Sequence, residues 1–408
     1  MKVCVVGLGY IGLPTALTLA AHEVPVVGID YNPELIASLK EGKITFDENG
    51  LADLFKEAQR NGIEFSTEYI KSSIYIIAVP TPYDRFSKKI DPAYVIKAFE
   101  SVMSVCSNGT IVVIESTVSP GTIDKYIRPL IAEKGFEVGK DIHIVHAPER
   151  IIPGNMIDEL LNNSRTIGAD DRKIGEKIKD LYTSFCRGSI VVTDIKTAEM
   201  TKVVENTYRD INIAFANELA MMCRRDKIDV YEVIKTCNMH PRVNILQPGP
   251  GVGGHCIPVD PWFLVGDYPG IASLTYQARK INDSMPEFTL GRISAIMKET
   301  GITDVSKIGL YGLAYKEDVD DIRESPTLQI LKSMEQHLAF GVKVYDPVVR
   351  QTDLVPGQYG DFEEFLEAID LLVIMVGHSH IKSNLDKLKD KVVLDTRNVS
   401  GLENAYKL

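Results

Sequence analysis

The first thirty residues constrain the fold of this chain more than any other stretch. Val3–Val6 is an apolar run of strand length, and the glycine pattern GLGYIG (7–12) follows it directly. An apolar, helix-length stretch continues to Ala21, and a second apolar run (25–29) ends at Asp30. Strand, spaced glycines, helix, strand and carboxylate in this order are typical of a βαβ unit that binds a dinucleotide.

Each glycine has its own expected role in such a unit. Gly7 permits the tight turn, Gly9 lets a pyrophosphate approach the backbone, and Gly12 lets the helix pack on the strand. Asp30 lies eighteen residues after Gly12, where a carboxylate binds the ribose 2′-hydroxyl. No arginine follows Asp30 to hold a 2′-phosphate, so the pattern favours NAD over NADP.

The alternation of strand and helix patterns continues along the chain. Apolar runs at 74–79, 110–115 and 142–145 are each followed by polar residues, among them Thr81 and Thr117. Because parallel strands end at the same edge of a sheet, we expect these polar residues to face one crevice. Either threonine could equally be a helix N-cap.

The last hundred residues predict a second, smaller doubly wound domain. Apolar runs at 307–313, 342–345, 371–376 and 392–394 alternate there with helical patterns. This region has no GxGxxG pattern, so we assign the dinucleotide to the first domain.

At 408 residues the chain is too long for a single core. The predicted fold class is α/β, with two Rossmann-like doubly wound domains joined by a helical central domain. We expect a NAD-binding domain at 1–190 and a central domain at 191–295, which contains one long helix and a dimer contact. The third domain is expected at 296–408.

The long helix is predicted at 197–226. Lys202, Asn206 and Arg209 are spaced four and three residues apart, so they share one face of it. A cationic, polar stripe on a mostly apolar helix suggests an anion or sugar site, although a solvated helix face would show the same spacing. A long helix that links two domains is also a common oligomer contact.

The segment 246–262 reads LQPGPGVGGHCIPVDPW, in which eight of seventeen residues are proline or glycine. Such a segment is expected to follow an irregular path rather than a helix or central strand. It contains Cys256 and, four residues later, Asp260. A thiol with a nearby carboxylate in a rigid loop suggests covalent catalysis. The alternative is a turn around a buried structural cysteine.

Composition excludes several classes of protein. A net charge of −11 argues against nucleic acid as a partner. The six cysteines are scattered without a CxxC pair, which predicts neither disulfides nor a metal site and fits a cytoplasmic protein. The uncharged stretch Val3–Ala21 mimics an export signal, but its glycines and Pro14 fit the dinucleotide motif better, so no membrane segment is expected.

Taken together, these motifs resemble those of the UDP-glucose/GDP-mannose dehydrogenase family. GLGYIGLP, VPTP, EST, APER, GGHC and YKEDVDDIRESP occur in the family's order over essentially the whole chain. The cysteine loop and the long helix look most like the branch that acts on UDP-N-acetyl-D-mannosamine. Where the UDP-glucose members have serine and lysine in the loop, this chain has His255 and Val259, and Pro153 replaces a second carboxylate.

The resemblance implies a NAD-dependent, four-electron oxidation of a UDP-N-acetylhexosamine at C6 to a carboxylate. In that scheme Cys256 attacks the aldehyde intermediate, and a thiohemiacetal and then a thioester form on it. Lys202 would act at the substrate oxygen, and Asp260 would help to activate water. The third domain would bind the UDP-sugar, and the protein would be a homodimer or a dimer-based oligomer.

Further site residues are carried over from the family motifs one at a time. The expected substrate contacts are Arg150, Ile151, Lys202, Asn206, Arg209, Gly253, Tyr315 and Lys316, with His240 and Arg242 supplied by a neighbouring subunit. The expected NAD contacts are Gly7, Gly9, Tyr10, Ile11, Gly12, Asp30, Thr81, Thr117 and Arg323.

Three alternatives stay open at this point. The substrate could be UDP-N-acetyl-D-glucosamine, whose branch has a very similar cysteine loop. An ordinary two-electron dehydrogenase would need no cysteine. A catalytically silent NAD-binding regulator would not need Cys256, Lys202, Asn206 and Asp260 together.

Overall fold

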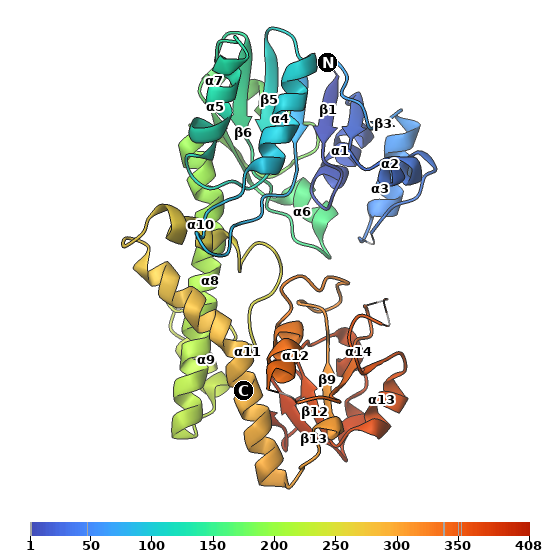
Figure 1. Ribbon diagram of the computed structural model, residues 1–408, viewed down its shortest axis with the longest axis vertical. Helices are drawn as coiled ribbons and strands as arrows, with labels where there is room; N and C mark the ends of the chain where they lie inside the picture. The colour runs from blue at the N-terminus through green and yellow to red at the C-terminus, as the bar shows by residue number, and fades with distance from the viewer. Residues whose placement is uncertain (1, 47, 338, 350, 352) are drawn as a thin grey trace. The chain divides into compact units, whose positions relative to one another are not determined.

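The computed structural model describes residues 2–46, 48–337, 339–349, 351 and 353–408. The chain forms two compact units, Met1–Glu205 and Asn206–Leu408. The boundary falls inside the long helix α8 (Ile195–Asp226), so this one helix contributes residues to both units (Figure 1).

The first unit is built on an eight-stranded sheet of order β3-β2-β1-β4-β5-β6-β7-β8. Paired strands run parallel except β6 and β7, which are antiparallel. The order 3-2-1-4-5-6 of its first six strands is that of a Rossmann fold, whose ligand site lies at the carboxyl ends of the strands, where the order reverses. The strands are β1 (Val3–Val6), β2 (Val26–Ile29), β3 (Glu64–Ser66), β4 (Ile74–Ile77), β5 (Thr110–Ile114), β6 (Ile142–His146), β7 (Arg165–Ala169) and β8 (Ile190–Thr193).

Helices cover this sheet because the strands are apolar on both faces. Every residue of β1, β4 and β5 is buried. On one face, Val3 and Val5 share a core cluster with Leu13 and Leu17 of α1. The helices of this unit are α1 (Gly12–Ala21), α2 (Pro33–Lys40), α3 (Leu51–Arg60), α4 (Ala93–Val105), the π-helical turn η1 (Ile123–Ile127), α5 (Arg128–Glu133), α6 (Met156–Asn162) and α7 (Arg172–Thr183).

The second unit begins with the remainder of α8 and three further helices, α9 (Val230–Cys237), α10 (Asp260–Asp267) and α11 (Ser273–Thr300). A six-stranded sheet of order β11-β10-β9-β12-β13-β14 follows, with parallel pairing throughout its named strands. This order repeats the 3-2-1-4-5-6 pattern of the first unit. The strands are β9 (Ile308–Tyr311), β10 (Lys343–Tyr345), β11 (Gln358–Tyr359), β12 (Leu371–Ile374), β13 (Val392–Asp395) and β14 (Tyr406–Lys407).

Helices lie on both faces of the C-terminal sheet, as the sequence pattern predicts for a doubly wound domain. Leu371 and Val373 of β12 pack with α11 and α12 (Pro326–Gln336), whereas Leu372 and Ile374 pack with α13 (Phe362–Ala368). Figure 1 shows α12 and α13 on opposite sides of the strands. Three short helical segments complete the unit: η2 (Val305–Lys307), α14 (Ser379–Lys382) and η3 (Leu385–Leu388).

The predicted α/β class, the two Rossmann-like sheets and the long central helix are confirmed. Every strand named in the sequence analysis is present, with bounds that differ by a few residues. β3, β7, β8, β11 and β14 were not predicted, because they are short or carry charged and exposed residues. Among the described residues, no helix combines the length and the apolar character needed to cross a membrane.

One expectation about the cysteine loop needs correction. The whole of 246–262 was expected to be irregular, but α10 already begins at Asp260. Pro261 does not prevent this, because a proline in the first turn of a helix lacks only an N–H that would have had no helical partner.

Candidate active site

The glycine turn after β1 shows which of its glycines the fold itself requires. Gly7 has a φ of +89°, and a Cβ there would lie 2.6 Å from the carbonyl oxygen of Ala78. A Cβ on Gly12 would lie 1.8 Å from the carbonyl oxygen of Gly7. A Cβ on Gly9 would meet no heavy atom within 4 Å. Protein packing therefore explains Gly7 and Gly12, whereas the space at Gly9 fits the close approach of a pyrophosphate.

Asp30 fits the second part of a dinucleotide site. One of its carboxylate oxygens accepts a hydrogen bond from the Leu8 amide at 2.8 Å, and the other accepts one from the Asn32 amide at 2.9 Å. The carboxylate thus lies directly beside the glycine turn. Carboxylate oxygens have further lone pairs, which could accept hydrogen bonds from ribose hydroxyls.

The other predicted NAD contacts of the first unit lie at the same edge of the sheet. Thr81 follows β4 and Thr117 follows β5, and both strands pair in parallel. The Ser116 hydroxyl accepts from the Val79 amide at 2.9 Å and donates to the Val79 carbonyl at 2.7 Å, which ties the two strand ends together. Two more predicted contacts surround the start of α1: Ile11 is its N-cap, and the Tyr10 ring packs on Phe46.

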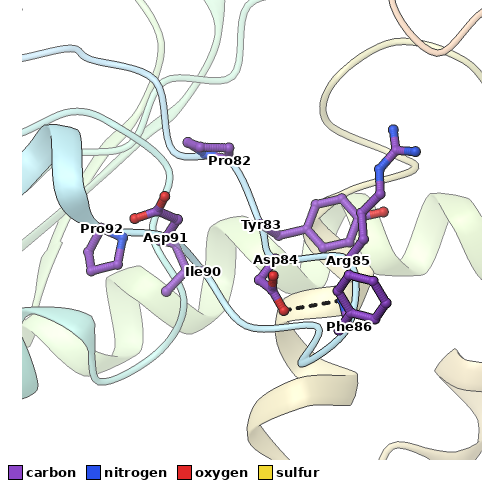
Figure 2. Close-up of a pocket in the computed structure, with 8 residues that line it drawn as sticks. All are labelled: Pro82, Tyr83, Asp84, Arg85, Phe86, Ile90, Asp91 and Pro92. Atoms are coloured by element: carbon purple, nitrogen blue, oxygen red, sulfur yellow. Dashed lines mark hydrogen bonds between the residues drawn. The ribbon is translucent and has the colours of Figure 1, made fainter.

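A pocket of about 590 Å³ lies in the loop after Thr81 (Figure 2). It is lined by Pro82, Tyr83, Asp84, Arg85, Phe86, Ile90, Asp91 and Pro92. The loop is folded on itself, with the Phe86 amide donating to Asp84 at 3.1 Å. None of the predicted catalytic residues lines this pocket, so we do not place the reaction there.

In the second unit, a tight turn joins the predicted nucleophile to the predicted acid. The Cys256 carbonyl accepts hydrogen bonds from the amides of Val259 at 3.1 Å and Asp260 at 2.8 Å. The Asp260 carboxylate is buried and accepts a hydrogen bond from the Asn206 side-chain amide at 2.6 Å. Three of the predicted site residues are therefore linked through one turn and one side-chain bond.

Two glycines let the cysteine loop lie directly against the segment after β9. A Cβ on Gly253 would be 2.5 Å from the Tyr315 Cβ, and one on Gly254 would be 3.0 Å from the Tyr315 ring. The Gly254 amide also donates to the carbonyl of Arg323 at 2.8 Å. Gly253 was predicted to contact the substrate; packing against Tyr315 is by itself a sufficient reason for both residues to be glycine.

The environment of Tyr315 shows which charges surround the cysteine. The pKa of the Tyr315 phenol is raised to about 12, mainly by burial; Asp321 and Cys256 contribute to the rise, whereas Arg323 and Arg209 oppose it. The Arg323 guanidinium is itself paired with Asp321 at 2.6 Å. Cys256 and Arg209 thus both lie within electrostatic reach of Tyr315.

Arg150 and Ile151 have mainly structural contacts in the first unit. The Arg150 guanidinium pairs with Glu205 at 2.8 Å and donates to the Thr166 hydroxyl at 2.9 Å. Ile151 belongs to the hydrophobic core of the unit. Lys202 is buried on α8, one turn before Asn206.

The remaining predicted contacts are exposed or half-buried. His240 and Arg242 are exposed after α9, as a contribution to a neighbouring subunit would require. Lys316 is half-buried beside Tyr315. Among the described residues, no group of three or more His, Cys, Asp or Glu side chains could hold a metal ion.

Comparison with protein-family models accounts for most of the chain. Residues 1–186 match the NAD binding domain of the UDP-glucose/GDP-mannose dehydrogenase family, 196–284 its central domain and 309–401 its UDP binding domain. The chain belongs to this family. It is therefore an NAD-dependent dehydrogenase of nucleotide sugars, and the predictions of family, enzyme class and cofactor are confirmed.

Relatives within the family match the chain along its full length. A UDP-N-acetyl-D-mannosamine dehydrogenase of Methanocaldococcus jannaschii is 41% identical and covers 98% of this chain and 93% of its own. The native structure of the UDP-N-acetyl-mannosamine dehydrogenase of Staphylococcus aureus has a TM-score of 0.89 at 40% identity, covering 100% and 98%. An NDP-N-acetyl-D-galactosaminuronic acid dehydrogenase of Ralstonia nicotianae is 39% identical, covering 97% and 95%.

The structure also shows contacts to the cysteine loop that the family motifs did not indicate. The Gly249 amide donates to the buried side chain of Asn217, and a Cβ on Gly249 would lie 2.6 Å from an Arg397 guanidinium nitrogen. Asn217 could have been noticed as the one amide in the apolar stretch 213–217 of the long helix. Arg397 carries no comparable signal, because its closeness to the loop arises from the fold of the C-terminal domain.

Proposed function

We propose that this protein oxidises UDP-N-acetyl-D-mannosamine at C6 to UDP-N-acetyl-D-mannosaminuronate, using two NAD molecules in succession. The observation that carries the proposal is the turn that links Cys256 to Asp260, with Asn206 holding the carboxylate. A thiol held in this way is needed for a second oxidation at the same carbon. A free aldehyde is not a hydride donor, whereas the thiohemiacetal that it forms with the thiol is.

The proposed reaction proceeds in four steps. The C6 alcohol loses a hydride and a proton and becomes an aldehyde. The Cys256 thiolate adds to the aldehyde carbon, forming a C–S bond and, with a proton, a thiohemiacetal. Loss of a second hydride and that proton gives a thioester. Water then attacks the thioester and the C–S bond breaks, which releases the carboxylate, the thiolate and two protons. In both oxidations the bound NAD supplies the hydride acceptor.

The chain's own residues supply proton transfer and orientation in this scheme. We assign to Lys202 the acid/base or oxyanion-stabilising role at the substrate oxygen. Asp260 is assigned to help activate water in the last step. Its bond with Asn206 fixes the carboxylate in one orientation, which general base catalysis requires.

The choice of sugar rests on sequence similarity within the family. Two of the relatives described above are named for N-acetyl-D-mannosamine, but the Ralstonia enzyme, nearly as similar, is named for another N-acetylated sugar. At Val252, Trp262 and Phe263 the cysteine loop resembles the mannosamine branch. Trp262 and Phe263 are buried in α10, so any effect that they have on specificity would act through packing. UDP-N-acetyl-D-glucosamine is the alternative substrate.

The test is a panel of UDP-sugars, with NADH measured by absorbance and the product by mass. We expect turnover of UDP-N-acetyl-D-mannosamine with two NADH formed per acid. Preference for the glucosamine epimer would correct the substrate, and NAD binding without turnover of any sugar would favour a regulator. Cys256→Ser should form no acid; full acid production by this variant would sink the covalent scheme.

Three further assignments belong to this proposal. We propose a homodimer or dimer-based oligomer, the division into domains at 1–190, 191–295 and 296–408, and a cytoplasmic location. No disulfide joins the six cysteines, all of which the structure describes, and this suits a reducing compartment. Each of the three matched family segments lies within one of the three proposed domains.

A further inference from the structure

The cysteine loop is fixed near its beginning by a buried side chain of α8. The Gly249 amide donates a hydrogen bond to Oδ1 of Asn217 at 2.9 Å, and both residues are buried. Gly249 belongs to an irregular, proline-rich stretch, so its amide has no helix or strand partner to fix it. Burying an amide N–H without a hydrogen-bond partner costs free energy. Asn217 supplies the partner only when the loop lies where the structure has it, so the bond favours this loop position.

The orientation of the Asn217 amide is set by a chain of buried hydrogen bonds. Its Nδ2 donates to Oδ1 of Asn282 at 2.8 Å, and the Asn282 Nδ2 donates to the Asp210 carboxylate at 2.7 Å. Since a carboxylate only accepts, Asn282 must turn its nitrogen toward Asp210 and its oxygen toward Asn217. Asn217 must then turn its own oxygen toward Gly249. Arg279 pairs with Asp210 at 2.5 Å and balances its charge.

α8 therefore holds the cysteine loop at two points. Asn206 binds Asp260 at the end of the loop, and Asn217 binds Gly249 near its beginning. Eleven residues are close to three helical turns, so the two asparagines lie on one face of α8, about 16 Å apart along its axis. The chain from Gly249 to Asp260 could extend over roughly twice that distance, so these two bonds confine the loop to a bend that contains Cys256.

We propose that Asn217 is a positioning residue for Cys256, which acts together with Asn206 by fixing both ends of the cysteine loop to one face of α8. Asn282 and Asp210 hold the Asn217 amide in the orientation that this requires. The inference rests on the proposed function, because it assumes that the thiol position decides whether the aldehyde is captured. Asn217 itself does not touch the reacting atoms.

Paired variants of Asn217 separate the loop contact from general packing. Asn217→Leu is similar in volume but cannot accept the Gly249 hydrogen bond. Asn217→Asp keeps an oxygen for Gly249 but loses the donor to Asn282. Both variants disturb the buried chain of hydrogen bonds, and only the leucine variant releases the loop. Thr289→Val is the matched stability control, since Thr289 is buried on α11 and donates to the Met285 carbonyl at 2.8 Å, which is no part of the hydrogen-bond chain of Asn217.

Two quantities are measured: the number of NADH formed per acid, and the amount of aldehyde that is released into solution and trapped there. A misplaced thiol lets the aldehyde escape, so Asn217→Leu should release aldehyde and form more than two NADH per acid, with kcat lowered about tenfold or more and KM little changed. A partly unfolded sample would lose rate at an unchanged ratio. Asn217→Asp and Thr289→Val should keep the wild-type ratio. A leucine variant that keeps that ratio and a kcat within about twofold of wild type would overturn the inference.

Alkylation of Cys256 by iodoacetamide, followed by peptide mass measurement, tests the inference without turnover. The rate for Asn217→Leu should differ from wild type by about threefold or more, and Thr289→Val should match wild type. Equal rates in all three proteins contradict the positioning role even if the enzyme is active. If the wild type alkylates normally but oxidises no sugar, the proposed function fails separately. Asn217→Ser, which is too short to reach Gly249, replaces the leucine variant if that does not fold.

Discussion

At the scale of single residues, the three glycines of the first turn have different reasons to be glycine. Gly12 would clash with the carbonyl of Gly7 if it carried a Cβ, whereas Gly9 has no protein neighbour within 4 Å of that position. The fold therefore requires glycine at position 12, and we propose that the approach of a pyrophosphate is the reason for glycine at position 9.

Gly9→Ala and Gly12→Ala should therefore fail in different ways. We expect Gly9→Ala to keep the wild-type melting temperature within a few degrees but to weaken NAD binding about tenfold or more, because the methyl group occupies the space for the pyrophosphate. Gly12→Ala should be strongly destabilised. NADH fluorescence titration and thermal melting measure the two effects; equal NAD affinity in Gly9→Ala and wild type would contradict the assignment.

Glu115 is a buried acid at the end of β5 that gives the first unit a pH-dependent stability. Burial raises its pKa to about 7; Glu149 raises it too, whereas Arg165 and a hydrogen bond from Tyr182 lower it. Between the ordinary pKa of about 4.5 and about 7, the folded protein keeps a proton that the unfolded chain releases. Stability is therefore highest below this window and falls as the pH rises through it.

Glu115→Gln should remove this contribution. Near pH 5 the variant and the wild type should have similar free energies of unfolding, because the acid is neutral in the folded protein. At pH 8 the variant should be relatively more stable, by up to about 3 kcal/mol. Urea denaturation at both pH values measures the difference. Burial also raises the pKa of Glu199 to about 7, but Glu199 remains in both proteins and does not affect the comparison. If the free energy of unfolding changes equally between the two pH values in both proteins, Glu115 does not have this role.

Sequence reasoning found the residues whose chemistry is written in a local motif. Cys256, Asp260 and Asn206 were predicted, and the structure links them. Sequence reasoning could not find the contact between Arg150 and Glu205, because that contact depends on how distant segments pack. Asn217 was missed for the same reason, since its partner Gly249 is thirty-two residues away.

At the scale of elements, the segment between Gly312 and Asp318 is held at both ends by the buried His378. Its Nδ1 accepts from the Asp318 amide at 2.9 Å, so the proton lies on Nε2, which is 3.3 Å from the Asp346 carboxylate. Asp346 in turn accepts from the Leu313 amide at 2.6 Å. Although burial raises the pKa of Asp346, the nearby His378 and hydrogen bonds from the amides of Ala314 and Val349 hold it down at about 2, so the carboxylate is ionised.

His378→Ala should loosen this segment, which carries Tyr315 and Lys316. If these residues bind the nucleotide sugar as predicted, KM for that substrate should rise about tenfold while NAD affinity stays unchanged. His380→Ala is the matched control, because His380 lies in α14 two residues after His378, but its Nδ1 bonds the Tyr311 hydroxyl rather than the Asp318 amide. Equal KM values for His378→Ala and wild type would mean that the segment does not need this support.

The elements themselves were mostly predictable, because periodicity is a local property. Apolar runs such as 371–376 and the long helix at 197–226 were found within a few residues. The weak strands were not, since β8 has no buried residue to give it a pattern and β7 begins with the buried Arg165. The antiparallel direction of β7 against β6 depends on a connection that no local pattern records.

At the scale of the whole molecule, α8 has an exposed apolar stripe that a soluble monomer would leave in water. Tyr208, Phe215 and Met222 are 68%, 49% and 54% exposed, and their spacing of seven residues places them on one face of the helix. A repeat of seven is the spacing at which helices pack side by side. This stripe supports the proposed dimer more directly than length or composition does.

Phe215→Glu should therefore weaken self-association, because it places a charge in the middle of the stripe. We expect wild type to behave as a dimer or larger in sedimentation experiments at micromolar concentration and the variant to shift toward the monomer, since truncating or charging a buried interface residue commonly costs about 2 kcal/mol or more. Lys235→Glu, an exposed change on α9 at a residue near Glu232, is the charge control and should leave the assembly unchanged. A wild-type monomer, or a variant with wild-type assembly, would show that this stripe is not the contact; activity lost together with the dimer would support the assignment of His240 and Arg242 to a neighbouring subunit.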